Sequence, residues 1–238
     1  MNNDDQTLPV AVVVGVGPGN GQALGARFAR EGYSVALLAR NREKLLGIAQ
    51  DMPHAHAYSC DVADPVSVRE TFEAIRQELG DVDVLLYNAG SGVFADFDEI
   101  TPEQFESSWR VNAMGAFLCA KQVVPGMERR GGGSIIFTGA TASLRGNVKT
   151  AAFAPAKAAQ RSLAESMARL LWPKGIHVAL MIVDGMVEKP GIDKFMKGRP
   201  VEALIDPAAL ADTAFQLCAQ SRRGWSFQVE VRPALENW

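Results

Sequence analysis

The sequence predicts a three-layer α/β fold, with one doubly wound, seven-stranded parallel sheet and helices on both of its faces. Short apolar runs rich in β-branched residues alternate along the chain with longer amphipathic stretches, which is the pattern of repeated βα units. A parallel sheet covered by helices on both faces follows from this alternation. We expect strands at 10–15, 34–39, 55–60, 82–87, 134–138, 177–183 and 226–231.

The amphipathic stretches between these runs predict six helices. We expect them at about 21–31, 43–51, 65–79, 102–127, 151–172 and 207–220. No low-complexity linker or internal repeat interrupts the pattern, so residues 1–238 are expected to form one domain. The segment 189–204 is rich in Gly, Pro and Lys between a strand and the last helix, and we expect it to be a mobile flap over a cleft.

The charge balance excludes two classes of partner. A formal net charge of -3 and a pI near 5.7 provide no basic surface for nucleic acid or for an anionic membrane. Residues 1–6 are polar and acidic, and the apolar run at 10–14 is too short for a signal sequence or a membrane span. We therefore expect a cytoplasmic protein that binds neither nucleic acid nor membranes.

The cysteine and histidine content predicts no metal site. Three cysteines without a C-x-x-C spacing suggest neither a disulfide framework nor a zinc site, and they suit a reducing cytoplasm. His54 and His56 alternate at the start of the third expected strand, and no third ligand lies at metal-binding spacing.

A glycine-rich turn directly follows the first expected strand and opens the first expected helix. Gly15, Gly19 and Gly21 form a G-x-x-x-G-x-G pattern, with Asn20 inside it. Glycines let the backbone approach a pyrophosphate, and the helix N-terminus supplies free N–H groups and the positive end of the helix dipole. A tight strand-to-helix turn would also explain the glycines, but their position after the first strand favours nucleotide binding.

Four further motifs follow at regular places along the chain. They are Cys60-Asp61-Val62 after the third strand, Tyr87-Asn88-Ala89-Gly90 after the fourth, Val111-Asn112-Ala113 in the fourth helix, and Phe153-Ala154-Pro155-Ala156-Lys157 in the fifth helix. Each alone has another explanation: a helix cap, a turn or an exposed polar residue. Together with the glycine turn, their order and spacing resemble the short-chain dehydrogenase/reductase family over most of the chain. The resemblance implies a Rossmann-type fold.

The resemblance also implies a dinucleotide site. In the family, the aspartate that matches Asp61 contacts the adenine, and the lysine that matches Lys157 binds the nicotinamide ribose. The residues expected to bind the cofactor are Gly15, Gly19, Asn20, Gly21, Arg40, Asp61, Val62, Asn88, Ala89, Gly90, Lys157, Gly185 and Val187.

The end of the second strand predicts the preferred cofactor. An NAD-binding protein would carry an acidic residue there to accept a hydrogen bond from the ribose 2′-hydroxyl, whereas Arg40 offers a planar cation suited to a 2′-phosphate. Arg40 could instead be a solvated residue beside Asn41, a plausible cap for the next helix. Because no Asp or Glu lies within 35–41, we expect NADP(H) to be preferred over NAD(H).

The expected reaction centre departs from the family at both of its hydroxyl positions. Phe153 stands where the family has its catalytic tyrosine, and Ala140 stands where it has its serine. Neither side chain can exchange a proton or form a hydrogen bond. Asn112 and Lys157 remain as catalytic candidates. Losing one such donor commonly costs on the order of 10² to 10³ in rate, so we expect very weak activity by the family's usual route.

An active enzyme would need a substitute proton donor. Thr141 and Ser143 are candidates, because one adjoins Ala140 and the other lies three residues after it. Further candidates are Tyr87, Thr138, Lys149, Asp184 and Glu188. Ordinary polar contacts, caps or surface ion pairs would explain each of them equally well.

Two functions follow. The first is an NADP(H)-dependent oxidoreductase with atypical or weakened hydride transfer to a small-molecule carbonyl or from an alcohol. The second is a catalytically silent NADP(H)-binding module that acts through cofactor-dependent oligomerisation or partner binding. The resemblance implies a homodimer or homotetramer through the helices at 102–127 and 151–172, where Trp109 and Trp172 are interface candidates.

Overall fold

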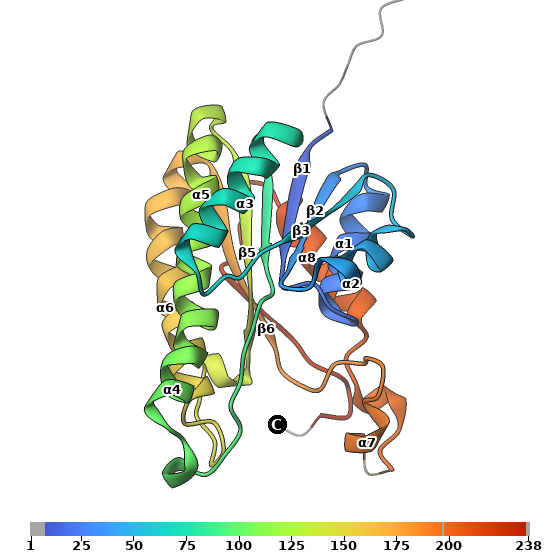
Figure 1. Ribbon diagram of the computed structural model, residues 1–238, viewed down its shortest axis with the longest axis vertical. Helices are drawn as coiled ribbons and strands as arrows, with labels where there is room; N and C mark the ends of the chain where they lie inside the picture. The colour runs from blue at the N-terminus through green and yellow to red at the C-terminus, as the bar shows by residue number, and fades with distance from the viewer. Residues whose placement is uncertain (1–7, 197, 237–238) are drawn as a thin grey trace, which may run out of the picture.

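The sheet contains seven parallel strands and lies between two layers of helices in the computed structural model, which describes residues 8–196 and 198–236 (Figure 1). The strand order is β3-β2-β1-β4-β5-β6-β7. The strands are β1 Val10–Val14, β2 Ser34–Ala39, β3 Ala55–Ser59, β4 Val84–Tyr87, β5 Gly133–Ala140, β6 Ile176–Val183 and β7 Gln228–Val231. The predicted fold class is therefore confirmed. The polar stretch at 1–6 lies outside the described residues.

The strand order reverses direction at the centre of the sheet. From β1 the chain moves outward through β2 to β3, and it then returns to place β4 on the other side of β1. Val14 pairs with Tyr87 in this register, so the connections that leave β1 and β4 begin side by side. Ligands of open α/β sheets bind in the crevice at such a reversal, outside the carboxyl ends of the strands.

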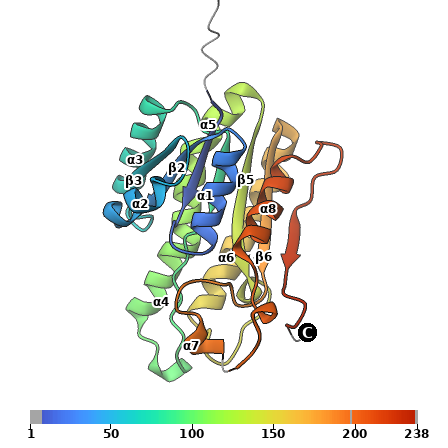
Figure 2. The ribbon, with the colours of Figure 1, turned by 90° about the vertical axis from the view of Figure 1, so that its right-hand side faces the viewer.

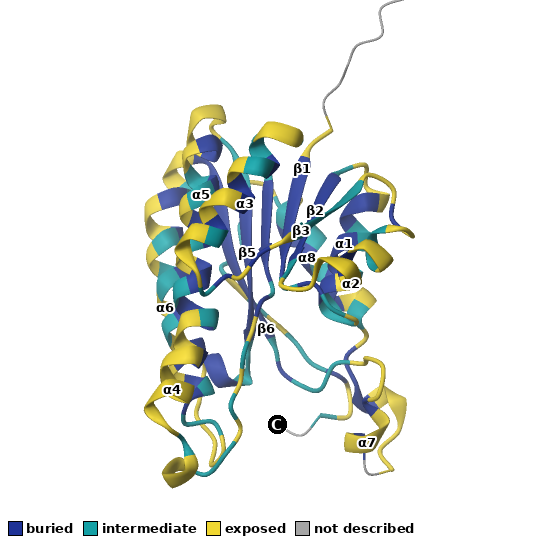
Figure 3. Cartoon of the chain, in the orientation of Figure 1, coloured by how far each residue is buried: buried dark blue, intermediate teal, exposed yellow. Residues whose placement is uncertain are grey.

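The two faces of the sheet bury separate cores, because successive side chains of a strand point to opposite faces. Val10, Val12 and Val14 of β1 pack towards one helical layer, whereas Ala11 and Val13 pack towards the other. The strands between the two layers are mostly buried, and the outer sides of the helices are exposed (Figure 3). One layer consists of α3 Pro65–Glu78, α5 Gly115–Arg130 and α6 Phe153–Leu171, and the other of α1 Asn20–Arg30, α2 Arg42–Ala49 and α8 Pro207–Cys218.

The helix predicted at 102–127 is interrupted. The structure has α4 Pro102–Trp109, one π-helical turn Arg110–Met114, and then α5. A π turn changes the hydrogen-bonding pattern within an otherwise helical stretch, and an apolar period does not reveal it. The Tyr87 hydroxyl donates a hydrogen bond to the Val111 carbonyl oxygen within this turn. This π turn contains Asn112 and holds it in a buried position.

The segment 184–206 lies at the carboxyl end of the sheet, at the same end as α4 (Figure 2). It contains the short helix α7 Asp193–Met196, and a single β-bridge joins Val187 to Ile205. Ile192, Met196 and Leu204 form a small apolar cluster inside it. The bridge closes the base of this segment, which includes most of the predicted flap.

The two tryptophans predicted at subunit interfaces differ in their surroundings. Trp109 is 39% exposed at the end of α4. Trp172 packs edge-on against His177 and Trp225, with ring centroids 5.9 and 5.8 Å away, and its indole N–H donates to the Val178 carbonyl oxygen at 3.1 Å. Trp172 therefore contributes to packing within the chain.

Candidate functional site

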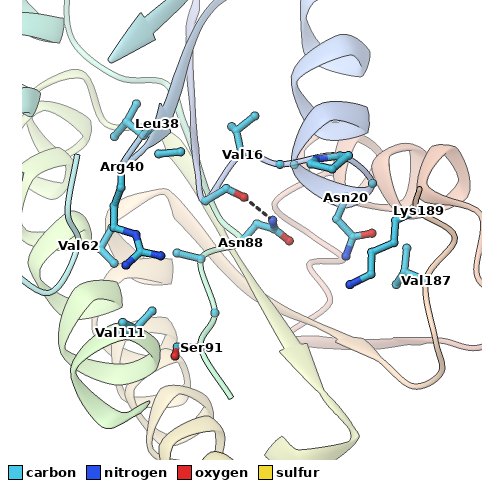
Figure 4. A pocket seen from close by; sticks show the side chains of 18 of the residues that line it. Val16, Asn20, Leu38, Arg40, Val62, Asn88, Ser91, Val111, Val187 and Lys189 are labelled. Carbon is cyan, nitrogen blue, oxygen red and sulfur yellow. Dashed lines mark hydrogen bonds between the residues drawn. The ribbon is translucent and has the colours of Figure 1, made fainter. Parts of the chain in front are cut away.

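A cavity of about 700 Å³ lies at the carboxyl ends of β1, β2 and β4, at the strand-order reversal (Figure 4). All of the predicted cofactor residues line it except Lys157 and Gly185. Sequence analysis missed several other lining residues, among them Ser91, Ser107, Val111, Met186, Lys189 and Ile192. The cavity thus brings together residues at the ends of β1, β2, β3 and β4 and residues of the segment after β6.

The glycine turn is built by backbone contacts that exclude any side chain. A Cβ atom on Gly15 would lie 2.4 Å from the Cα atom of Ala89, and one on Gly21 would lie 2.7 Å from the Gly15 carbonyl oxygen. Gly15 also has a φ of +86°, which side chains disfavour. The Asn88 amide donates to the Gly15 carbonyl oxygen at 2.8 Å and joins the two loops. At Gly15 and Gly21 the cavity is therefore bounded by backbone alone.

The start of α1 leaves polar groups for a ligand. Gly19 precedes the helix and provides no side-chain cap, and the first turn carries no acidic residue. The Asn20 amide oxygen is buried without a hydrogen-bond partner. It can accept from a ligand hydroxyl or, with the amide turned, its nitrogen can donate to a phosphate oxygen. The side chains of Asn20 and Lys189 lie beside each other at this edge of the cavity (Figure 4).

The end of β2 presents a cation to the cavity. Arg40 is exposed, and its guanidinium extends towards Val62 and forms no hydrogen bond or ion pair with another of the described residues (Figure 4). The adjacent Asn41 caps α2, because its side chain accepts from the Lys44 backbone N–H at 3.0 Å. Asn41 is therefore the cap of α2, as expected, and the Arg40 side chain lies exposed at the cavity.

The Asp61 carboxylate lies on the same wall of the cavity as Arg40. It accepts a hydrogen bond from the Ala63 backbone N–H at 3.0 Å, within its own turn. The Asp61 backbone N–H donates to Ser67 at 3.0 Å, which ties the turn to α3. The helix cap itself is Asp64, so Asp61 does not serve in that role.

Lys157 lies buried just behind the cavity wall, and only 4% of its surface is exposed. Its ammonium group donates to the Thr138 carbonyl oxygen at 2.8 Å and to the Gln160 side-chain oxygen at 3.1 Å. Burial away from water disfavours the charged form and lowers the pKa of Lys157 to about 7. A Cβ atom on Gly90, which lines the cavity, would lie 3.9 Å from its Nζ atom.

Asn112 is fully buried in the π-helical turn and anchors the neighbouring loop. Its amide nitrogen donates to the carbonyl oxygens of Ser91 at 2.6 Å and Ser108 at 2.8 Å. Its amide oxygen has no partner and lies 3.5 Å from a Cβ position built on Gly90. The Asn112 backbone carbonyl oxygen accepts from the Gln160 amide at 3.0 Å. Gln160, which the sequence motifs did not single out, therefore links the two catalytic candidates.

Phe153 places an aromatic ring without a hydroxyl beside Lys157. The ring centroid is 6.0 Å from the Lys157 Nζ atom and 5.3 Å from the ring of Phe94. Phe94 is 64% exposed, so this aromatic pair faces solvent on one side. Apolar contact replaces the polar function that a tyrosine would have at this position.

The two proposed substitute hydroxyls are already hydrogen-bonded. The Thr141 hydroxyl donates to the Asp184 carboxylate, which also pairs with Arg232. The Ser143 hydroxyl accepts from the Ala140 backbone N–H at 3.1 Å. Both side chains therefore have structural roles in the connection after β5.

The remaining candidate donors have structural contacts or lie elsewhere. The Tyr87 hydroxyl is bonded in the π turn, and burial raises its pKa well above the ordinary value. Lys149 forms an ion pair with Asp96 at 3.8 Å. Glu188 is exposed and does not line the cavity.

Gly185, predicted to bind the cofactor, does not line the cavity. A Cβ atom there would lie 2.7 Å from the Pro233 side chain, so the position accommodates packing against the C-terminal segment. Among residues 8–196 and 198–236, no cluster of three metal-binding side chains occurs, and no helix is long and apolar enough to cross a membrane.

Comparison with known proteins identifies the family. The profile of the short chain dehydrogenase family matches residues 9–196. The chain belongs to the short-chain dehydrogenase family. This short-chain dehydrogenase is 35% identical over 191 residues to 2-(R)-hydroxypropyl-CoM dehydrogenase of Xanthobacter autotrophicus, which covers 76% of this chain and 75% of that protein. The family resemblance seen in the sequence is thereby confirmed, and with it membership in a group of nicotinamide-dependent oxidoreductases.

Solved structures show the same fold. A short-chain dehydrogenase from Rhodopseudomonas palustris superposes with a TM-score of 0.82 at 33% identity, covering 94% of this chain and 98% of that one. An alcohol dehydrogenase from the archaeon Thermococcus sibiricus, in complex with 5-hydroxy-NADP, superposes with a TM-score of 0.85 at 25% identity, covering 96% and 98%.

Proposed function

We propose that this short-chain dehydrogenase binds NADP(H) in the cavity and exchanges hydride weakly with a small carbonyl compound or alcohol. The observation that carries the cofactor assignment is Arg40, whose guanidinium lines the cavity without a hydrogen bond or ion pair to another described residue, at the strand end where a ribose phosphate would be recognised. The NADP derivative in the related alcohol dehydrogenase supports this assignment.

The residues present fit a dinucleotide along the whole cavity. The bare backbone between Gly15 and Gly21, together with the N-terminus of α1, would hold the pyrophosphate. Asp61 and Val62 would contact the adenine, and Lys157, just behind Gly90, would face the nicotinamide ribose. When bound, NADP(H) would supply the hydride that is exchanged with the substrate.

The weakness of the reaction follows from the side chains at the reaction centre. No hydroxyl is present at Ala140 or Phe153, the Thr141 hydroxyl donates to Asp184, and the Ser143 hydroxyl accepts from the Ala140 backbone N–H. A developing charge on the substrate oxygen would therefore lack the pair of donors that the family uses.

The test is to compare two neighbouring arginines. Arg40→Ala should weaken NADPH binding by roughly 10- to 100-fold, because it removes a charge-assisted contact to the 2′-phosphate, and it should change NADH binding by less than about 3-fold. Arg42→Ala, at the exposed start of α2 and outside the cavity, is the matched control. Dissociation constants from nucleotide fluorescence would provide the comparison. Equal weakening of both nucleotides, or no weakening, contradicts the assignment.

A second function, a catalytically silent NADP(H)-binding module, is favoured by the engagement of both substitute hydroxyls. It would act in the cytoplasm through a homodimer or homotetramer. Phe105, Trp109 and Phe117 are exposed along α4 and α5 and would contribute to such an interface. Tight NADPH binding, no NADPH oxidation with aldehydes, ketones or quinones, and a cofactor-dependent change of mass in light scattering would establish this alternative.

A further inference from the structure

Gln160 is a fully buried amide, with no exposed surface, one helical turn after Lys157 on α6. Its side-chain oxygen accepts from the Lys157 ammonium at 3.1 Å. Its side-chain nitrogen donates to the Asn112 backbone carbonyl oxygen at 3.0 Å. Burying an amide is costly unless its groups are paired, and here both ends are paired between the two catalytic candidates. Gln160 therefore fixes the lysine to the π-helical turn.

The described groups that contact the Lys157 amine are neutral. They are the Phe153 ring and the Gln160 side-chain oxygen of α6 and the Thr138 carbonyl oxygen of β5, and a Cβ atom built on Gly90 would lie 3.9 Å away. Burial lowers the pKa of Lys157, and none of the contacts named above is a carboxylate that would hold it in the ammonium form.

The hydrogen bonds of Lys157 leave one donor for the site. An ammonium group has three N–H bonds, and two of them are directed to Thr138 and Gln160. The amine also lies 6.0 Å from the centre of the Phe153 ring, which lacks the family's proton-donating hydroxyl. The lysine is thus a titratable group at the reaction centre, and its acceptors on Thr138 and Gln160 are neutral.

We infer that Gln160 is a positioning residue that makes Lys157 the proton carrier of this site, in place of the hydroxyls missing at Ala140 and Phe153. The inference rests on the proposed function, which supplies the hydride. In carbonyl reduction, one Nζ–H bond of Lys157 breaks and an O–H bond forms on the substrate oxygen, which leaves a neutral amine. Water then returns a proton to the amine. In alcohol oxidation the amine accepts the proton from the substrate hydroxyl.

The neutrality of Gln160 is the essential feature. A carboxylate in the same place would form an ion pair with Lys157 and hold it as an ammonium group. An apolar side chain would remove an acceptor that stabilises the ammonium form. Changes at position 160 should therefore move the titration of Lys157 in opposite directions according to their charge.

The test uses Gln160→Glu and Gln160→Met, two substitutions of similar length. Nitrogen-15 NMR of the lysine side chains in the cofactor-free full chain would follow the Lys157 titration, with Lys157→Met to assign the signal. We expect a midpoint near pH 7 in the wild type, a rise of at least about one pH unit in Gln160→Glu, and a fall in Gln160→Met. The alkaline decline of the rate of carbonyl reduction should shift with the midpoint in each variant.

Four outcomes overturn the inference: no titration of Lys157 between about pH 6 and 8, midpoint shifts that the rate profile does not follow, a Lys157→Met variant that retains most of its turnover, or NADPH binding without any turnover. The proposed function fails separately, if wild-type protein does not bind NADPH in the fluorescence titration. If one variant does not fold, the other still gives a signed shift to compare with the wild type.

Discussion

The dinucleotide end and the reaction end of this short-chain dehydrogenase are built from different parts of the chain. At the dinucleotide end, backbone atoms form the surface, and a side chain on Gly15 or Gly21 would collide with backbone less than 3 Å away. At the reaction end, individual side chains would perform the chemistry, and Ala140 and Phe153 stand at the two positions where the sequence resemblance predicts hydroxyl groups. The two ends thus depend on different parts of the residue, the backbone at one and the side chain at the other.

The difference shows which kind of site tolerates substitution within an intact fold. A phenylalanine fills nearly the same space as a tyrosine, so Phe153 packs against Phe94 without disturbing α6. Larger residues in the glycine turn would push the loops after β1 and β4 apart. Chemistry can therefore be lost from this fold more easily than cofactor binding.

The largest expected effect is on NADPH affinity, when a side chain is placed in the glycine turn of the dinucleotide end. Gly15→Val should weaken NADPH binding by more than about 100-fold, because its side chain would overlap Ala89 and the residue would have to keep a positive φ. Fluorescence titration would measure affinity, and circular dichroism would show whether the sheet remains folded.

The matched control for that variant is Gly47→Ala on α2, where a Cβ atom meets no other atom within 4 Å. It should leave NADPH affinity unchanged and raise stability by roughly 0.5–1 kcal/mol, since alanine favours a helix over glycine. Undiminished NADPH binding by folded Gly15→Val would remove the glycine turn from the proposed site.

The next largest effect is expected when hydroxyl groups are restored at positions 140 and 153 of the reaction end. The double variant Ala140→Ser with Phe153→Tyr should raise ketone reduction by roughly 100-fold or more, because it supplies a donor and an acid beside Lys157. NADPH oxidation under saturating cofactor would measure the gain. The single Ala140→Ser variant is the control and should gain far less. An inactive double variant that still binds NADPH would mean that the cleft itself differs from the family.

A smaller effect concerns the stability of the protein around Lys157. Below about pH 7 the lysine carries its proton in both the folded and the unfolded chain, so the cost of burying the charge is fully present. Between about pH 7 and 10.5 the unfolded chain binds a proton that the folded chain has released, and stability therefore rises with pH. Lys157→Met should stabilise the cofactor-free protein by roughly 2 kcal/mol at pH 6 and by much less at pH 10.

Urea unfolding of wild type and Lys157→Met at several pH values would check this. The difference between the two proteins isolates the lysine, because other titrating groups contribute equally to both. If Lys157→Met raises the free energy of unfolding equally at pH 6 and pH 10, the lysine is not neutralised on folding. Lys157 would then not be the titrating group that distinguishes the reaction end from the dinucleotide end.

Much of the fold and of the dinucleotide end was predictable from local patterns. The periodic apolar runs located all seven strands, and the motifs at strand ends located the cavity wall, since the carboxyl ends of parallel strands share one edge of the sheet. The π-helical turn was missed because its residues keep helical character. Lys189 was missed as a lining residue because the segment after β6 has no regular period that could place its side chain.

The sequence by itself determined the family, the glycine turn and the absence of an exchangeable proton at positions 140 and 153, because covalent identity and short-range spacing suffice for these. Only the tertiary structure decided which groups surround Lys157 and which partners the hydroxyls of Thr141 and Ser143 have. Gln160 reaches Asn112 across 48 residues, and Thr141 reaches Asp184 across 43. Such pairings depend on how the sheet brings distant segments together, and no local pattern encodes them.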